Sequence, residues 1–180
     1  MENHLAKASL RALITSSRPQ PSDGLTENLI RLATDFNAKT IASYSSLANE
    51  PNVTEFNKWV SSVGRTLLLP RIKGDYLEFA IGQTKPGSFG ISEPVGHATS
   101  IAEADLILLP ALAVDKTGVR LGKGKGYYDR ALEQILSIPK FAVVFKSEIY
   151  EELPSEPHDQ KVMGAITPTA IHYFRPLRSE

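Results

Sequence analysis

The sequence predicts an α/β fold with three layers (α/β/α), in which helices cover both faces of a largely parallel sheet. Two observations predict this class. Segments with the composition of strands alternate along the chain with segments that have the 3.6-residue period of amphipathic helices. The run at residues 106–110 is continuously apolar, as expected of a strand buried on both faces. A length of 180 residues fits one domain, so we treat residues 1–180 as a single domain.

The first third of the chain predicts three helices. Residues 5–15 are rich in helix formers and are separated from the next helix by a turn-rich stretch at residues 18–24. The helix at residues 25–37 has one apolar stripe, made of Leu25, Leu29, Leu32, Ala33 and Phe36. A third helix begins near Asn52, because Asn52 and Glu55 have the spacing of a capping box. Its apolar face comprises Phe56, Trp59, Val60 and Val63.

The remaining elements alternate between strands and loops. The predicted strands are residues 39–44, 66–69, 76–81, 106–110, 141–145 and 164–167. We expect Pro70 to end the second of them, because proline cannot donate a ladder hydrogen bond. Residues 82–96 predict an ordered loop and residues 151–161 a polar loop. A last helix is expected at residues 127–138, with Leu132, Ile135 and Leu136 facing inward.

The stretch Arg120-Leu-Gly-Lys-Gly-Lys-Gly-Tyr-Tyr-Asp129 carries the most chemical information. Its glycines let a ligand approach the backbone N–H groups, and a predicted helix N-terminus follows directly. Lys123 and Lys125 add positive charge, and Asp129 could hold a divalent cation on phosphate oxygens. The spacing matches neither the Walker loop nor the dinucleotide fingerprint. The residues alone therefore leave two interpretations open, a phosphate-binding loop and a flexible basic turn.

Composition excludes several classes of function. The chain has no cysteine, which excludes disulfides, thiolate zinc sites and a cysteine nucleophile. Twenty basic residues balance twenty acidic ones, so we expect neither nucleic acid nor a membrane as a partner. The four histidines are far apart in the sequence, which argues against a histidine metal cluster. No signal peptide or transmembrane run is apparent, so we expect a cytoplasmic protein that acts as a monomer.

One extended string carries a family resemblance: Leu-Leu-Pro110-Ala-Leu-Ala-Val-Asp115 followed by Gly118-Val-Arg-Leu-Gly-Lys-Gly-Lys-Gly-Tyr-Tyr-Asp129. It resembles the 5-formyltetrahydrofolate cyclo-ligase family, also called methenyltetrahydrofolate synthetase. Weaker matches are Lys7…Leu10-Arg11, Glu50-Pro-Asn52, Leu69-Pro-Arg71, Phe89-Gly-Ile…Glu93-Pro94 and Pro154…His158-Asp159. The resemblance implies a reaction that uses ATP and Mg²⁺ to convert 5-formyltetrahydrofolate to 5,10-methenyltetrahydrofolate. ADP and phosphate are released, and the path runs through an N5-iminium phosphate.

The resemblance also implies the site residues. It assigns ATP binding to Lys7, Arg11, Arg120, Leu121, Gly122, Lys123, Gly124, Lys125, Gly126, Tyr127 and Tyr128. Arg120, Lys123 and Lys125 are the candidates for stabilising the transferred phosphoryl group, a reaction that depends on positioning and electrostatics. The folate contacts would be Ser45, Glu50, Phe89, Lys123, Gly124, Lys125, Gly126 and Tyr127. Asp129 and Asp159 would hold the magnesium ion.

Each assignment has a structural alternative when the residue is taken alone. Lys7 and Arg11 lie on one helical face, which is equally the pattern of a solvated basic face. Asp129 suits the first turn of any helix, and Phe89 could anchor a loop. The chain departs from the family at Met163, where an acidic residue is frequent. Two other functions stay open, a non-catalytic folate- or nucleotide-binding paralogue and RNA binding through the glycine-lysine loop.

Overall fold

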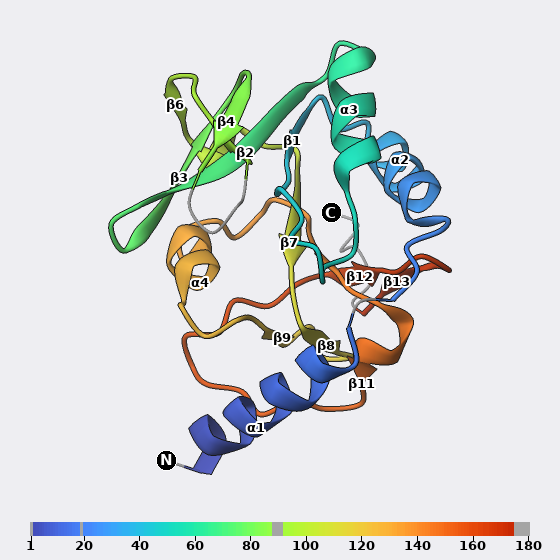
Figure 1. Cartoon of the computed structure of the whole chain (residues 1–180), viewed down its shortest axis with the longest axis vertical. Helices are drawn as coiled ribbons and strands as arrows, with labels where there is room; N and C mark the ends of the chain where they lie inside the picture. Colours follow the sequence, from blue (N-terminus) through green and yellow to red (C-terminus); the bar gives the residue numbers. More distant parts are fainter. Residues whose placement is uncertain (1, 19, 88–91, 175–180) are drawn as a thin grey trace.

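The computed structural model describes residues 2–18, 20–87 and 92–174. Within them, the centre of the fold is an eight-stranded sheet with the order β13-β12-β10-β7-β1-β2-β3-β6 (Figure 1). In chain order its strands are β1 (Thr40–Ala42), β2 (Thr66–Lys73), β3 (Tyr76–Ala80), β6 (Ala98–Thr99), β7 (Leu106–Pro110), β10 (Lys140–Val143), β12 (Gly164–Ile166) and β13 (Ile171–Tyr173). The neighbours from β12 to β2 pair in parallel, and both ends of the sheet pair antiparallel. The predicted largely parallel α/β sheet is confirmed.

Helices cover the two faces of this sheet unequally. The helices α2 (Leu25–Asp35) and α3 (Thr54–Ser62) pack on one face, and the short α4 (Tyr127–Leu132) packs on the other (Figure 1). Strand β7 separates the two cores, with Leu106 and Leu108 in the α2–α3 core and Ile107 and Leu109 in the α4 core. All four side chains are fully buried, which explains the unbroken apolar run of this strand.

A small second sheet supports the N-terminal helix. Its order is β11 (Ile149–Tyr150), β8 (Ala113–Asp115) and β9 (Arg120–Leu121). Helix α1 (Glu2–Ser16) lies along this sheet and buries Ile14 against Leu112, Val119 and Leu153 (Figure 1). The sequence analysis missed these strands, because two or three residues show no alternation. Two 3₁₀ turns, η2 (Ile101–Glu103) and η3 (Lys146–Glu148), precede β7 and β11.

A buried ion pair joins the end of α1 to the body of the molecule. Arg18 Nε lies 2.6 Å from Glu148 Oε1, and Arg18 Nη2 lies 2.6 Å from Glu148 Oε2. The Arg18 side chain also donates to the carbonyl of Ala111 at 2.7 Å and packs over the Phe145 ring. Glu148 accepts a further hydrogen bond from the backbone N–H of Phe145. The arginine therefore fixes the chain just after β7 relative to η3.

The last predicted helix is shorter than expected. Helix α4 ends at Leu132, not at residue 138, and Leu136 is 83% exposed, whereas it was expected to face inward. Leu132 is fully buried, and Ile135 and Ile138 still pack against the α4 core. Pro139 explains part of the difference, because the residue before a proline is biased away from the helical conformation.

Strand β2 runs through Pro70, whereas we expected it to stop there. The strand continues to Lys73, and Pro70 is paired with Phe79 of β3. Strand β1 pairs with β2 only as far as Leu68. Within the described residues, Pro70 therefore pairs with a strand on one side alone, which is β3. A proline is tolerated at such an edge position, because no ladder bond requires its missing N–H.

Two local predictions were wrong in detail. The expected loop at residues 82–96 contains a pair of antiparallel strands, β4 (Thr84–Pro86) and β5 (Ser92–Pro94). No capping box forms at α3, because the helix has Val53 and not Asn52 at its N-cap, and the Glu55 side chain pairs with Lys58. Asn52 instead accepts a hydrogen bond from the N–H of Thr54, which stabilises the start of the same helix in another way.

The strand order changes direction beside β1. The chain passes from β1 through α3 to β2 on one side, and later returns to β7 on the other side of β1. Ligands of open α/β sheets bind outside the carboxyl ends of the strands at such a switch point. The topology therefore directs attention to the segments that follow β1 and β7. No helix in the described part of the chain is long and apolar enough to cross a bilayer.

Candidate active site

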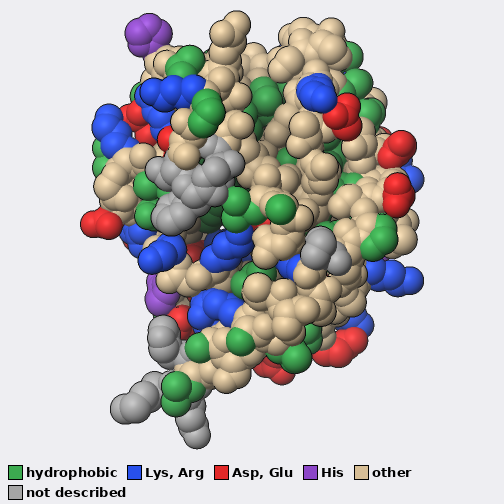
Figure 2. Space-filling model, in the orientation of Figure 1, with side chains coloured by type: hydrophobic (Ala, Val, Ile, Leu, Met, Phe, Trp, Pro, Cys, Tyr) green, Lys and Arg blue, Asp and Glu red, His purple; other side chains and the backbone are tan. Residues whose placement is uncertain are grey.

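A cavity of about 430 Å³ opens at the carboxyl ends of β1 and β7. Figure 2 shows Lys and Arg side chains gathered across the middle of this face of the molecule, above α1. The predicted site residues within the described ranges all line the cavity: Lys7, Arg11, Ser45, Glu50, the segment Arg120–Asp129 and Asp159. Phe89 lies outside the described residues. Residues from α1, the β1–α3 connection, the glycine loop and the segment before β12 therefore meet at one place.

The glycine loop runs between β9 and α4 and depends on backbone conformations that favour glycine. Gly124 has φ 91° and Gly126 has φ 66°, the left-handed region in which other residues are strained. Arg11 of α1 lies across this loop, and its Nε donates to the carbonyl of Gly122 at 2.8 Å. A Cβ added at Gly124 would lie 3.4 Å from the Arg11 guanidinium carbon. The helix and the loop are thus in direct contact.

Lys7 connects α1 to the segment before β12. Its Nζ lies 2.7 Å from Asp159 Oδ2 and 2.7 Å from Glu156 Oε2. Burial lowers the pKa of Lys7, but the hydrogen bonds and charges of these two carboxylates outweigh burial, so the pKa lies above its usual value. The ion pair with Lys7 correspondingly lowers the pKa of Glu156. Lys7 is therefore held as a cation at the wall of the cavity.

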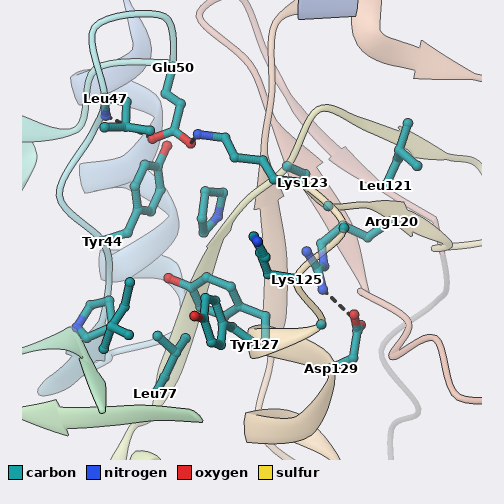
Figure 3. Close-up of a pocket in the computed structure, with 18 of the residues that line it drawn as sticks. Tyr44, Leu47, Glu50, Leu77, Arg120, Leu121, Lys123, Lys125, Tyr127 and Asp129 are labelled. Atoms are coloured by element: carbon teal, nitrogen blue, oxygen red, sulfur yellow. Dashed lines mark hydrogen bonds and ion pairs between the residues drawn. The ribbon is translucent and has the colours of Figure 1, made fainter. Parts of the chain in front are cut away.

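Arg120 and Asp129 form the second charged pair (Figure 3). Arg120 Nη2 lies 2.9 Å from Asp129 Oδ1, and the guanidinium lies over the Tyr128 ring at 5.8 Å. The Arg120 Nε atom is buried without a hydrogen-bond partner among the described residues. Burial raises the pKa of the Tyr128 phenol, with a further contribution from the charge of Glu50, so Tyr128 stays protonated.

Lys123 and Glu50 form the third pair and join two walls of the cavity. Figure 3 shows Lys123 reaching from the glycine loop to Glu50, with a distance of 2.7 Å between Nζ and Oε1. Glu50 Oε2 accepts from the N–H of Leu47 at 2.9 Å, which orients the carboxylate. Tyr44 lies beside this pair, and its phenol donates to the carbonyl of Pro51. The β1–α3 connection therefore presents an anchored carboxylate to the cavity.

Lys125 differs from the other basic residues of the loop. Its ammonium group has no ion-pair partner among the residues described, and Figure 3 shows the side chain between the Lys123–Glu50 and Arg120–Asp129 pairs. An unpaired cation, a glycine-rich loop and two further arginines are the features of a site for a polyanionic ligand. The apolar residues Leu77 and Tyr127 form another part of the lining.

The family model for the 5-formyltetrahydrofolate cyclo-ligase family matches residues 4–168. The chain belongs to the 5-formyltetrahydrofolate cyclo-ligase family. A cyclo-ligase from Mycolicibacterium smegmatis is 36% identical over 143 residues, which cover 72% of this chain and 74% of the relative. The mouse cyclo-ligase is 30% identical over 175 residues, 87% of this chain and 86% of the relative. This cyclo-ligase family member is accordingly an enzyme, an ATP-dependent ligase.

Solved structures agree with this membership. The NMR structure of Aquifex aeolicus 5,10-methenyltetrahydrofolate synthetase has a TM-score of 0.81 and 28% identity, covering 97% of this chain and 95% of that one. A Mycoplasma pneumoniae 5,10-methenyltetrahydrofolate synthetase, at 24% identity and a TM-score of 0.73, shares the fold over 90% of this chain and 98% of its own.

Carboxylate donors for a metal ion lie at one end of the cyclo-ligase cavity. Asp129 and Asp159 both line it, and the N–H of Gln160 lies 3.4 Å from Asp129 Oδ1, so the two acids belong to adjoining segments. Glu156 and His158 lie next to Asp159, with their ligand atoms within 4.8 Å of one another. Hard oxygen donors are what magnesium prefers, so this donor set fits the ion. Met163, which stands where the family often has an acidic residue, packs against the α2–α3 core.

The sequence analysis missed several lining residues. Tyr44, Leu47, Pro70, Ile72, Leu77, Glu93, Pro110 and Ala111 also line the cavity. Most are apolar or backbone-bonded, and no sequence pattern separates them from core residues. Pro110 and Ala111 could have been expected, because they follow the buried strand β7 at its carboxyl end.

Proposed function

We propose that the chain converts 5-formyltetrahydrofolate to 5,10-methenyltetrahydrofolate in a reaction that depends on ATP and Mg²⁺. The proposal rests on one observation: the cationic loop, the carboxylate pair and Glu50 line a single cavity at the switch point of the sheet. It requires a polyanion and a neutral heterocycle to bind side by side. The cavity offers cations for the first ligand and, at Glu50, a hydrogen-bond acceptor for the second.

In the first chemical step, the formyl oxygen on N5 would attack the γ-phosphorus of ATP. An O–P bond forms, the bond to the β,γ-bridging oxygen breaks, and ADP leaves. Lys125, Arg120 and Lys123 would offset the negative charge on the transferred group, in a reaction that consists mostly of positioning and electrostatics. Lys7 and Arg11 would hold the rest of the triphosphate from the α1 side.

In the second step, N10 of the folate would attack the formyl carbon of the N5-iminium phosphate. The C–O bond to phosphate breaks, N10 loses its proton, and phosphate leaves with the bonding electrons. The same cations would stabilise the departing phosphate. Glu50 and the aromatic wall at Tyr127 would keep the folate oriented so that N10 and the formyl carbon lie in contact.

Asp129 and Asp159 would hold the magnesium ion, which when bound neutralises phosphate charge and orients the triphosphate. Both carboxylates are bonded to cations in this structure, Asp129 to Arg120 and Asp159 to Lys7. We infer that these pairs hold the carboxylates near their binding positions, and that they loosen when magnesium and phosphate arrive together.

An absorbance assay tests the proposal. Protein, 5-formyltetrahydrofolate, ATP and magnesium are combined, and the methenyl band in the near ultraviolet is followed against a control without ATP. We expect growth of the band only in the complete mixture. A folded protein that binds ATP but makes no methenyl product would contradict the proposal. Such a result would favour the alternative of a non-catalytic paralogue, which folate calorimetry would then test.

A further inference from the structure

Among the acids that line the cavity, one has no ion-pair partner within the described residues. Four acids line it. Glu50, Asp129 and Asp159 each form an ion pair, with Lys123, Arg120 and Lys7 in turn. Glu93 of β5 has no cationic partner among the described residues. The family resemblance includes Glu93 within its motif but gives the residue no role.

Glu93 is nevertheless held in place. Its Oε1 lies 3.4 Å from the N–H of Ile72 on β2. Gly87 makes room for the carboxylate, since a Cβ there would lie 2.4 Å from Glu93 Cδ and 2.7 Å from its Oε2. The side chain is half-buried, with Ile72 of β2 and Gly87 as its neighbours. Its position is thus determined by the surrounding backbone and is not that of a freely solvated surface acid.

The surroundings of Glu93 are mostly apolar on the cavity side. Pro70, Ile72 and Leu77 belong to the same wall. A carboxylate beside apolar side chains is costly unless donors complete its hydrogen bonds. A triphosphate suits this place poorly, because its negative charge is repelled by the carboxylate. The pterin of the folate and the adenine of ATP both carry N–H groups. The adenine is tied to a triphosphate that we place at the cationic loop, so we take the pterin as the group that faces Glu93.

We propose that Glu93 is a further substrate-recognition residue, whose carboxylate accepts hydrogen bonds from the pterin ring of 5-formyltetrahydrofolate. This inference rests on the proposed function. The pterin carries a ring N–H and an exocyclic amino group side by side, which match the two oxygens of one carboxylate. Glu50, which is paired with Lys123, remains the first acceptor for the folate, and Glu93 would be a second one from β5.

Two substitutions test the role of Glu93. Glu93→Gln keeps the size and one acceptor for Ile72 but turns an amide donor towards the pterin donors, and Glu93→Ala removes the acceptor altogether. Because hydrogen bonds to charged groups contribute about 1.5–3 kcal/mol, we expect the KM for folate to rise about 10- to 100-fold in both. The KM for ATP and the melting temperature should stay close to those of the wild type. Glu55→Gln, which removes a surface charge from α3, is the matched control.

A folate analogue without the 2-amino group tests whether Glu93 contacts the pterin directly or only supports the structure of the cavity. The analogue should bind the wild type at least about tenfold more weakly, and Glu93→Ala should add little to that loss. The inference would be overturned if the loss of affinity from the analogue and the loss from Glu93→Ala simply added. It would also be overturned if the KM for folate were unchanged in both variants. Calorimetry with 5-formyltetrahydrofolate gives a readout that needs no turnover. A wild type that binds folate but makes no product would refute the proposed function and still allow this test.

Discussion

The cationic side chains of the cavity differ in how strongly the protein itself already holds them. Lys7, Arg120 and Lys123 are paired with carboxylates, and Arg11 donates to a backbone carbonyl. Lys125 is exposed, and its ammonium group forms no ion pair with the described residues. A cation without a protein partner breaks no ion pair when it binds a phosphate group, so it contributes the most to the binding free energy of that ligand.

Lys125→Ala should therefore reduce catalysis without harming the fold. We expect the turnover number to fall about 10²- to 10³-fold, the range for loss of one group that stabilises transition-state charge. The melting temperature should change little, because the side chain is exposed. Steady-state kinetics and thermal melting check this, with Lys58→Ala on the surface of α3 as control. Turnover at the wild-type rate would remove Lys125 from the proposed mechanism.

The pKa of Lys7 predicts a dependence of stability on pH. The folded-state pKa lies above the ordinary value of 10.5, because the bonds to Asp159 and Glu156 outweigh burial. The stabilisation is therefore complete below pH 10.5 and is lost as the pH rises through the raised pKa. Lys7→Met should melt at a lower temperature than the wild type at pH 7, and the difference should shrink above pH 10.5. A difference that is constant with pH would show that the lost stability is not electrostatic.

At the scale of elements, the buried pair of Arg18 and Glu148 joins α1, the end of β7 and η3. Its side chains are 1% and 2% exposed. Glu148→Ala leaves the guanidinium buried without its anion, so we expect unfolding free energy to fall by about 3–5 kcal/mol. Denaturant melts measure this. The double variant Arg18→Met with Glu148→Leu should lose clearly less, because no charge is then left unpaired; an equal loss would contradict this reading.

The elements that the sequence predicted well have strong periodic signals. Leu25, Leu29, Leu32 and Ala33 of α2 are all fully buried, and α2 spans most of the expected range. The closely spaced glycines and lysines indicated a candidate phosphate-binding loop, with a flexible basic turn as the alternative, and in the structure the loop lines the cavity. The spacing of Lys7 and Arg11 indicated one helical face, and both side chains line the cavity.

The elements that were missed depend on tertiary contacts. Strands β8, β9 and β11 are two or three residues long and exist because they pair with one another and pack under α1. The early end of α4 depends on where the chain must enter β10. Glu93 has no local signal as a site residue, since its place in the cavity comes from β2 and from Gly87. The roles of the individual site residues remain predictions.

For the molecule as a whole, ligand binding should raise stability through linkage. At ATP concentrations about 100 times its dissociation constant, the folded state gains about 2.7 kcal/mol. For a chain of this size that corresponds to a rise in melting temperature of about 5–10 °C. We expect most of the rise to require magnesium, so EDTA should remove it, as should Asp159→Asn. An equal rise without magnesium would argue against the assigned carboxylate site.

The cavity is assembled from segments that are far apart in the sequence. Lys7 and Asp159 are 152 positions apart and meet at 2.7 Å, so a nascent polypeptide has no complete site until Asp159 has left the ribosome. A cut between β6 and β7 would leave Lys7, Arg11 and Glu50 on one fragment. The glycine loop and Asp159 would be on the other. Neither fragment alone would make methenyl product. If each fragment were fused to one of two interacting proteins, recovered turnover would report that those two proteins had bound each other.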